Sequence, residues 1–435
     1  FNAGGNGFGD RSDEGLLVFN HEYINPECFY QPDTDPAEWL LPFTLEKAKK
    51  GQAGHGASVA HVRRNAAGEW SLVAGSPYNR RIHGNTPMDI QGPARGHALV
   101  QTTDDPAGTT VLGMLNNCGN GRTPWGTFLT CEENFNGYFG STDAGFTRNT
   151  LEARYGLTTG GFGYLWHTVD PRFDMSVERA GFRTAWQVEI DPFAPTSQPV
   201  KRTALGRFKH ENAELVVAPN GKVVVYMGCD EVNEYIYKFV SNGTFDASNP
   251  TSAANRDLLA DGTLYVARFD AGTTAGDRMG TGVWIPLVFG QNGLDAGNGW
   301  TSQADIAIRT RQAADRVGAT MMDRPEWVSA NPTKPGEVMI TCTNNSRRGT
   351  TTASSNAADG TTAAGAARPP VDEANPRAVN SWGHIVRWNE TGGDATALTF
   401  DWDIFLLAGQ PSNAGLPNAP SSNINADNLF NSPDG

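Results

Sequence analysis

Short apolar runs follow one another along the chain, and Gly, Pro, Asn or Asp bounds nearly all of them. This pattern is typical of short β-strands joined by tight turns. Three segments have the form of β-hairpins, because asparagine and glycine at their turns supply the positive φ values that tight turns require. These segments are residues 61–73, 215–227 and 327–340. The pattern therefore predicts an all-β fold.

Helical periodicity is scarce, and the best short helical candidates are residues 44–49 and 302–316. The second begins at Ser302, a residue type that favours the N-cap position. Residues 349–367 contain almost no large apolar side chain, so they cannot bury a core. We expect them to form a flexible low-complexity insertion within a single domain that spans residues 1–435, because β-runs of similar character lie on both sides.

Four of the apolar runs end in similar polar clusters, which begin at Asn20, Cys131, Cys229 and Cys342. Three of these clusters carry a cysteine at the same place. They lie roughly 100 to 110 residues apart, which equals about two blades of a β-propeller at about 40–50 residues each. The repeat predicts a propeller-like architecture in which equivalent strand ends point to one face.

A carboxylate that opens a strand lies at the same end of a hairpin as the polar residues that close the antiparallel neighbour. The residues gathered by this argument are Glu22, Glu132, Glu133, Glu214, Asp230, Glu231, Glu326 and Asn344. So many carboxylates at short range raise one another's pKa or require cations, and a bound metal cluster would resolve the repulsion. The alternative is a set of separate solvated carboxylates, each at its own turn.

The chain has five cysteines, an odd number that leaves at least one thiol outside any intramolecular disulfide. Cys229 and Cys342 lie within apolar strands, and we expect them to be buried as small hydrophobic side chains. Cys131 differs because it directly precedes Glu132 and Glu133. A thiolate beside two carboxylates is unfavourable without a metal, and sulfur among oxygen ligands suggests a transition metal beside calcium.

The formal net charge of −13 argues against nucleic acid or an anionic membrane as a general partner. It is compatible with calcium, which binds carboxylate and carbonyl oxygens, and equally with an ordinary acidic surface. No apolar run approaches the length of a membrane span. No export signal is present, but the chain opens at Phe1, so we expect that an N-terminal signal has been removed or lost.

Six motifs along the chain resemble those of the PhoX-type alkaline phosphatases. They are LLVFNHEY, WGTFLTCEENFNGYF, FKHENAEL, YMGCDE, RPEWV and WGHIVRW, and the resemblance extends from about residue 15 to the C-terminus. It implies a six-bladed β-propeller with inserted loops and a few short helices. It also implies hydrolysis of phosphate monoesters, and of diesters in some members, at alkaline pH. Family members are typically exported in the folded state by the twin-arginine route, which implies a periplasmic or secreted protein. A propeller needs no partner to bury its core, so we expect a monomer.

The family's site resembles a mixed cluster of two ferric irons and two or three calcium ions, which supplies a metal-bound oxygen nucleophile. By this resemblance Cys131 looks like the thiolate that ligates iron. Glu22, Glu132, Glu211, Glu214 and Glu326 look like metal carboxylates, and Arg324 looks like the arginine that binds phosphate. The full predicted metal set is Cys131, Glu22, Glu132, Glu211, Glu214, Glu326, Asp230, Glu231 and Asn344. From the residues alone, Arg324 could instead be a salt-bridge partner of Glu326.

One departure from the family pattern lies at the C-terminus, where residues 432–435 form a hairpin-opening sequence with no strand behind it. A propeller needs its last strands to close the ring, so we expect this one to be truncated. Two other functions remain open: a calcium-dependent propeller hydrolase of lactones or organophosphates, and a non-catalytic extracellular binding propeller stabilised by calcium. Iron content separates the phosphatase from both.

Overall fold

The computed structural model describes residues 11–30, 42–410, 420–421 and 430–434 of the 435-residue chain. The chain forms two compact units, each assembled from three separate stretches. Unit 1 consists of Phe1–Arg148, Leu157–Arg207 and Asp246–Ala260, and unit 2 consists of Asn149–Gly156, Phe208–Phe245 and Asp261–Gly435. The single domain expected from the sequence stays a prediction.

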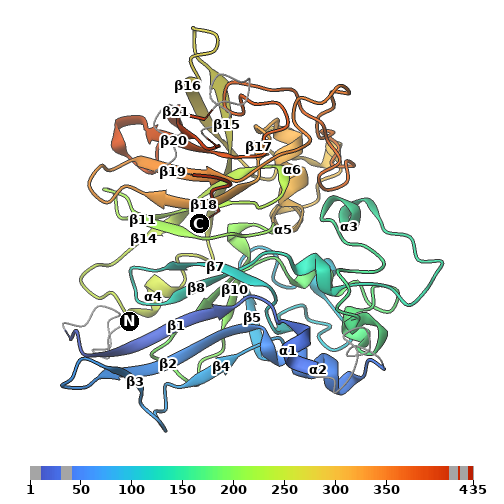
Figure 1. The fold of residues 1–435 in the computed structure, drawn as a ribbon, viewed down its shortest axis with the longest axis vertical. Coiled ribbons are helices and arrows are strands. Elements are labelled where there is room, and N and C mark those ends of the chain that lie inside the picture. Colours follow the sequence, from blue (N-terminus) through green and yellow to red (C-terminus); the bar gives the residue numbers. More distant parts are fainter. Residues whose placement is uncertain (1–10, 31–41, 411–419, 422–429, 435) are drawn as a thin grey trace. The chain divides into compact units, whose positions relative to one another are not determined.

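Unit 1 contains two sheets (Figure 1). The first is four-stranded and antiparallel, with β2 (Gly56–Arg64) paired to β1 (Glu14–His21), β3 (Trp70–Leu72) and β4 (Arg80–Ile82). The second has the strand order β6-β5-β10-β9-β8-β7. Its strands are β5 (Pro87–Gln91), β6 (Thr110–Leu112), β7 (Asn117–Arg122), β8 (Phe128–Glu132), β9 (Gln187–Ile190) and β10 (Val200–Arg202).

Short helices connect these strands within unit 1. The α-helices are α1 (Pro26–Tyr30), α2 (Leu45–Gly54) and α4 (Ala253–Arg256). The 3₁₀ helices are η1 (Ala98–Val100), η2 (Phe135–Tyr138), η3 (Trp166–Thr168), η4 (Pro171–Phe173), η5 (Ala180–Arg183) and η6 (Thr203–Leu205). Helix α2 begins after Thr44, whose side chain accepts a hydrogen bond from the Lys47 amide and so satisfies one of the unpaired donors of the first turn.

Unit 2 is built on a nine-stranded sheet with the order β11-β12-β14-β15-β16-β21-β20-β19-β18. Its strands are β11 (Glu214–Val217), β12 (Lys222–Gly228), β14 (Ile236–Thr244), β15 (Gly262–Ala271), β16 (Met279–Pro286), β18 (Pro325–Ala330), β19 (Glu337–Cys342), β20 (His384–Glu390) and β21 (Thr399–Leu407). A separate pair joins β13 (Val232–Glu234) to β17 (Met322–Asp323). Its helices are α3 (Thr150–Arg154), α5 (Gln303–Ile308), α6 (Thr310–Val317), η7 (Ala296–Asn298) and η8 (Thr391–Gly393).

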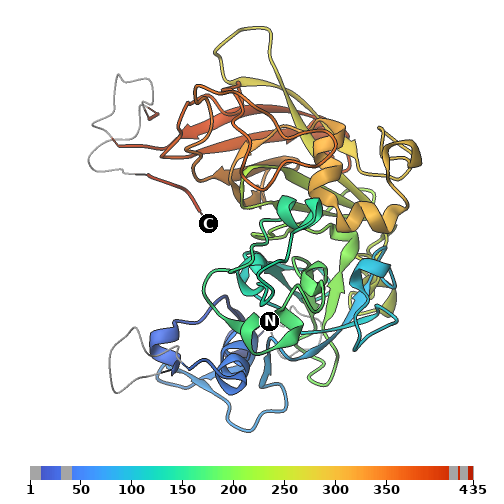
Figure 2. The same cartoon turned by 90° about the vertical axis from the view of Figure 1, so that its right-hand side faces the viewer.

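The two edges of the nine-stranded sheet come back to each other, and side chains link them. Asn212, which precedes β11, donates from Nδ2 to the Val328 carbonyl at 2.8 Å and accepts from the Val328 amide at 2.9 Å. Glu214 accepts from the Ala330 amide at 3.0 Å. The sheet is therefore nearly closed, which covers edges that would otherwise expose unpaired backbone groups (Figures 1 and 2).

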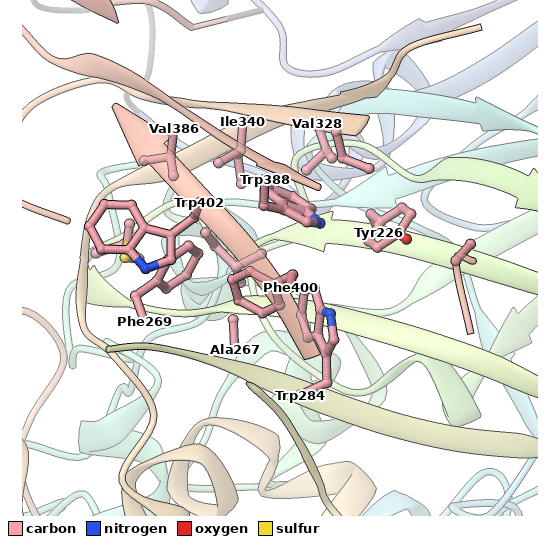
Figure 3. Close-up of a cluster of buried hydrophobic side chains, with 14 of the residues drawn as sticks. Tyr226, Ala267, Phe269, Trp284, Val328, Ile340, Val386, Trp388, Phe400 and Trp402 are labelled. Carbon is pink, nitrogen blue, oxygen red and sulfur yellow. The ribbon is translucent and has the colours of Figure 1, made fainter. Parts of the chain in front are cut away.

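The inner face of this sheet buries a large aromatic cluster, which includes Tyr226, Trp284, Trp388, Phe400 and Trp402 (Figure 3). The rings are tilted or edge-to-face, with centroids 5.2 Å apart for Trp284 and Phe400. Such arrangements stabilise a core beyond the area that they bury. The cluster gives unit 2 a hydrophobic core of its own, so its loop ends are carried on a rigid support.

A second buried feature of unit 2 is a cluster of four charged side chains. Arg154 of α3 binds Glu234 and also binds Asp315, the latter with Nε at 2.8 Å and Nη2 at 2.9 Å. Arg311 lies 3.6 Å from Glu234 and donates from Nη2 to the sulfur of Cys229 at 3.1 Å. All four charged residues are buried, and burial of charge is tolerated only when the charges are paired.

The fold confirms the all-β prediction with few short helices. The three predicted hairpins appear as β2–β3, β11–β12 and β18–β19. The predicted helix at 302–316 is present as α5 and α6, and Ser302 caps it as expected. Residues 349–367 form turns that contact the rest of unit 2, for example through the Ala364 amide and the Ala153 carbonyl at 3.0 Å. Within the described part of the chain, none of the helices has the length and apolar character needed to cross a bilayer.

Candidate functional site

An acidic group in unit 2 brings together Glu211, Glu326 and Asp434, whose carboxylate oxygens lie within 4.8 Å of one another. Glu326 belongs to β18, and Glu211 lies shortly before β11 at the opposite edge of the nearly closed sheet. Glu211 and Glu326 are buried, whereas Asp434 is exposed. An oxygen of Asp230 lies equally close to Glu211, so the group extends to the end of β12. The return of β18 towards β11 is therefore what assembles this group.

Arg324 forms the cationic side of the same group. Its Nε and Nη2 donate to the two carboxylate oxygens of Asp230 at 2.8 and 2.9 Å, and Nη2 also donates to Glu326 at 3.0 Å. Its φ is +56°, a left-handed conformation that is unusual for a side chain of this size. The Arg324 carbonyl accepts from the Thr343 amide at 3.1 Å, which helps to hold that conformation. Strained backbone of this kind clusters at functional sites.

In this group of carboxylates, the positive charge of Arg324 does not balance the negative charges. Burial, followed by the Asp230 and Glu211 carboxylates, raises the pKa of Glu326 to about 12, and the charge of Arg324 offsets only part of this. Burial would also raise the pKa of Asp230, but the hydrogen bonds and charge of Arg324 outweigh it and lower that pKa below its usual value. A cation at this place would allow Glu326 to ionise.

A second group lies in unit 1 and combines a thiol with two carboxylates. The ligand atoms of Glu22, Cys118 and Glu133 lie within 4.8 Å of one another. Glu22 follows β1, Cys118 lies in β7 and Glu133 follows β8, so three neighbouring strand ends supply one residue each. The side chain of Asn20 links two of these strands, because its Nδ2 donates to the Cys118 and Gly119 carbonyls at 2.8 Å each. One sulfur with two carboxylates suits a transition metal, whereas the oxygen-only group in unit 2 suits calcium or a ferric ion.

Glu132 does not belong to either group. Both of its oxygens accept from the Lys201 ammonium at 2.8 Å, and they also accept from the Leu115 and Trp186 amides at 3.1 Å. The side chains of Glu132 and Lys201 are fully buried. Burial raises the pKa of Glu132 and lowers that of Lys201, and their attraction opposes both shifts. The carboxylate of Glu132 therefore has a complete set of protein partners.

Four other predicted site residues are not members of the two groups. Cys131 is buried and donates from its sulfur to Gln187 at 3.1 Å. Glu231 binds Lys209 at 2.9 Å; burial would raise its pKa, but Lys209 and Arg311 lower it. Glu214 accepts from the Ala330 amide, and burial raises its pKa. Asn344 is half-buried in the segment that follows β19.

Cys118 and Asp434 lie close to predicted ligands but are absent from the metal set predicted from the sequence. Glu133 was included among the carboxylates expected to lie near one another, but not among the predicted metal ligands. A signal for Cys118 was present, because β7 is the hairpin partner of β8 and Asn117 pairs with Glu132. A residue at the start of one strand lies beside the residue at the end of its antiparallel neighbour, and this applies to a cysteine near the start of β7 as it does to a carboxylate. Asp434 carries no comparable signal, since it lies in an irregular segment.

Comparisons with known proteins give a specific match. The family profile described as "Alkaline phosphatase PhoX" matches residues 4–435. The chain is also similar to a solved structure of Pseudomonas fluorescens PhoX in complex with vanadate, a transition state analogue. The identity is 47% and the TM-score 0.89, and the alignment covers 98% of this chain and 70% of the other. No curated protein matches the chain.

Proposed function

Because this chain belongs to the PhoX family of alkaline phosphatases, and is a phosphatase with a β-propeller-like fold, we propose that it hydrolyses phosphate monoesters, and also diesters, at alkaline pH with iron and calcium bound at its two acidic groups. The family is metal-dependent. The observation that carries the proposal is the donor chemistry of Glu22, Cys118 and Glu133, because one thiol and two carboxylates whose ligand atoms lie within 4.8 Å of one another form a donor set that suits a transition metal.

We propose that iron binds at the group in unit 1, where the thiol is a ligand that calcium does not use. Glu211, Glu326 and Asp230 would hold the harder ions, ferric iron or calcium. The high pKa of Glu326 supports this assignment, since three carboxylates this close do not all ionise without a cation. When bound, such ions act as Lewis acids towards the phosphoryl oxygens. Two irons and two or three calcium ions are the complement expected by resemblance.

Two cysteines compete for the role of thiol ligand. Cys131 is the one predicted from the sequence, and its sulfur donates to Gln187. Cys118 is the one whose sulfur lies within 4.8 Å of two carboxylates, and we propose it as the ligand. By the same argument Glu133 replaces Glu132, whose oxygens bind Lys201. Glu214, Glu231 and Asn344 stay predicted ligands that a metal-loaded structure would test.

Arg324 is proposed to bind the phosphoryl group of the substrate. Its side chain is 30% exposed, so part of the guanidinium remains accessible while Asp230 and Glu326 fix its orientation. A planar guanidinium can donate two parallel hydrogen bonds to phosphate oxygens and can stabilise negative charge in the transition state. Asp230 would thus hold the arginine in place before the substrate arrives, and a two-bond contact with phosphate would require Arg324 to exchange a hydrogen bond with Asp230 or Glu326 for one with the substrate.

We propose a periplasmic or secreted monomer that acts on small-molecule phosphoesters, and the support is that PhoX proteins are commonly exported. A net charge of −13 is consistent with a small anionic substrate only if bound cations create a locally positive site.

The test combines elemental analysis of the purified protein with phosphomonoesterase and phosphodiesterase assays from pH 7 to 11. We expect iron and calcium together with alkaline monoesterase activity. Active protein that contains calcium but no iron would contradict the assignment of iron to Cys118. Protein with both metals but without turnover of either ester would contradict the proposed reaction.

A further inference from the structure

Asn116 connects two of the residues proposed to hold metal in unit 1. It directly precedes β7, two residues before Cys118, and its main-chain carbonyl accepts from the Glu133 amide at 2.9 Å. Its side-chain Oδ1 accepts from the Asn134 amide at 2.6 Å. Asn116 is buried, and its φ is +51°, a left-handed conformation that asparagine adopts more readily than most residues. One residue therefore fixes the backbone of Glu133 beside the segment that carries Cys118.

The other polar atom of this side chain, Nδ2, contacts Tyr138. It donates to the Tyr138 hydroxyl at 3.2 Å. Tyr138 belongs to η2 and is buried. Its ring stacks on Tyr164 with centroids 4.5 Å apart, and it packs against Trp166 with centroids 4.8 Å apart. The aromatic neighbours hold the hydroxyl in one place, and the hydroxyl in turn orients the Asn116 amide.

His55 determines the direction of these hydrogen bonds. Its Nδ1 lies 2.7 Å from the Gly51 carbonyl, which can only accept, so Nδ1 carries the proton. Burial lowers the pKa of His55 to about 4, so the ring is neutral at alkaline pH and Nε2 is an acceptor. The Tyr138 hydroxyl, 2.8 Å from Nε2, therefore donates to His55 and keeps its lone pairs for the Asn116 amide. Each group in this chain of hydrogen bonds has one orientation that satisfies its neighbours.

The proposed ligands need such support because they repel one another before a cation binds. The ligand atoms of Glu22, Cys118 and Glu133 lie within 4.8 Å of one another, a separation at which ionised groups of like charge are unfavourable. Asn20 opposes the repulsion on one side, since its Nδ2 donates to the Cys118 carbonyl at 2.8 Å and its Oδ1 accepts from the Thr130 hydroxyl at 2.7 Å. Glu133 requires a corresponding support on the other side.

We propose that Asn116 and Tyr138 are positioning residues for metal binding in unit 1, which hold Glu133 beside Cys118 and Glu22 before the ion arrives. They act through the backbone of Glu133 and not as ligands. The inference rests on the proposed function, because it concerns the iron assigned to this group. Residues that orient metal ligands typically change metal affinity by about 10–100-fold, since a preorganised site has less to order when the ion binds.

The variant Tyr138→Phe tests this inference, because it removes the hydroxyl and keeps the ring that stacks on Tyr164. Iron affinity is measured on the metal-loaded protein by competition with a chelator. The visible absorption band of a ferric thiolate is recorded in parallel, since it reports the contact between iron and sulfur. We expect iron affinity to fall at least about tenfold and the band to weaken as iron is lost.

Tyr155 offers a matched control in unit 2. It is equally buried, and its hydroxyl also contacts two main-chain groups, the Ile308 carbonyl at 3.1 Å and the Arg311 amide at 3.3 Å. Tyr155→Phe should lower the melting temperature as Tyr138→Phe does, but it should leave iron affinity within about twofold of the wild type. Equal losses of iron affinity in the two variants would mean a general loosening of the fold and would overturn the inference.

The variant Asn116→Gly separates the side chain from the backbone. Glycine adopts a φ of +51° without strain and keeps the carbonyl that accepts from the Glu133 amide, but it loses the contacts with Asn134 and Tyr138. We expect its iron affinity to fall at least as far as that of Tyr138→Phe. Iron-loaded wild type with unchanged affinity in both variants would overturn this inference alone. Wild-type protein that binds no iron would instead contradict the proposed function, and this inference with it.

Discussion

Arg324 and Asp230 are joined by two hydrogen bonds, at 2.8 and 2.9 Å, although they lie 94 residues apart in the chain. The same guanidinium also reaches Glu326 at 3.0 Å. A single cation therefore serves two carboxylates that are both largely buried. The position of Arg324, which is proposed to bind phosphate, therefore depends on the same carboxylates that are proposed to hold metal.

Replacement of Arg324 by lysine should reduce kcat for phosphomonoesters by about 100-fold or more, because lysine keeps the charge but loses the planar fork. Arg268 offers a matched control, since it makes the same two-bond contact with Asp270, at 2.9 and 3.1 Å, in an exposed position. Arg268→Lys should change kcat by less than about twofold. Steady-state kinetics of both variants measure this, and similar kcat values for the two would remove Arg324 from the reaction.

The cysteine variants Cys118→Ser and Cys131→Ser should separate the two candidate thiol ligands. We expect Cys118→Ser to lose iron and activity, because its sulfur lies beside Glu22 and Glu133. Cys131→Ser should retain both, since serine can still donate to Gln187. Elemental analysis of both purified variants is the measurement. Loss of iron from Cys131→Ser alone would restore the ligand predicted from the sequence.

Removal of metal by a chelator should abolish activity and lower the melting temperature. Ions that bind only the folded state stabilise it by about 4 kcal/mol at a concentration a thousandfold above Kd. Without a cation, Glu326 is expected to be protonated, because burial and its neighbours raise its pKa to about 12. Rebinding of metal at pH 8 should therefore release protons. Calorimetric titrations in buffers with different ionisation enthalpies measure this release, and its absence would contradict the proposed ligand role of Glu326.

Replacement of Lys201 by methionine should destabilise the protein by about 3–5 kcal/mol, because it leaves the Glu132 carboxylate buried without its cation. Lys334 is the matched control, since it makes a single ion pair with Glu337 at 3.0 Å but its side chain is 65% exposed. Lys334→Met should cost less than about 1 kcal/mol. Denaturant titration of both variants gives the two free energies of unfolding, and equal values would mean that burial does not govern this pair.

Acid should destabilise the protein in part through His55. This residue is buried, with its ring nitrogens 2.7 Å from the Gly51 carbonyl and 2.8 Å from the Tyr138 hydroxyl. Burial lowers its pKa to about 4 from an ordinary value of 6.5. Between these values the unfolded chain binds the proton and the folded chain does not, so the contribution is complete above pH 6.5 and is lost as the pH falls. At pH 5 the loss of stability should amount to about 2 kcal/mol.

The variant His55→Gln removes this titration. The free energy of unfolding of His55→Gln should fall less between pH 7 and pH 5 than that of the wild type, by about 2 kcal/mol. Denaturant unfolding at the two pH values measures the difference. An unchanged pH dependence would show that His55 is protonated in the folded state as readily as in the unfolded state.

The strands and hairpins could be predicted from the sequence because they depend on neighbouring residues. The turn chemistry of residues 218–221 and the alternation around it lead directly to β11 and β12. The closure of the nine-stranded sheet could not be predicted in this way. It depends on contacts such as those between Asn212 and Val328, which are 116 residues apart and whose pairing has no local signature.

The candidate site shows the same division. Motif resemblance pointed to Glu211 and Glu326, and the structure brings their carboxylates together. It selected Glu132 as the metal carboxylate, whereas the structure places Glu133 beside Glu22 and Cys118. The proposal of Glu133 instead of Glu132 rests on Lys201, which lies 69 residues away and binds Glu132. No pattern within the Glu132–Glu133 motif contains that information.

The assignment of Arg154 to unit 2 has a consequence for synthesis of the protein. The chain passes between the two units five times, after residues 148, 156, 207, 245 and 260. Arg154 leaves the ribosome well before its partners, since Glu234 follows 80 residues later and Asp315 follows 161 residues later. Until both have been translated, the nascent chain holds a charged side chain that it cannot bury. Arg154 therefore stays hydrated during this interval, and neither unit can be completed before the other has begun.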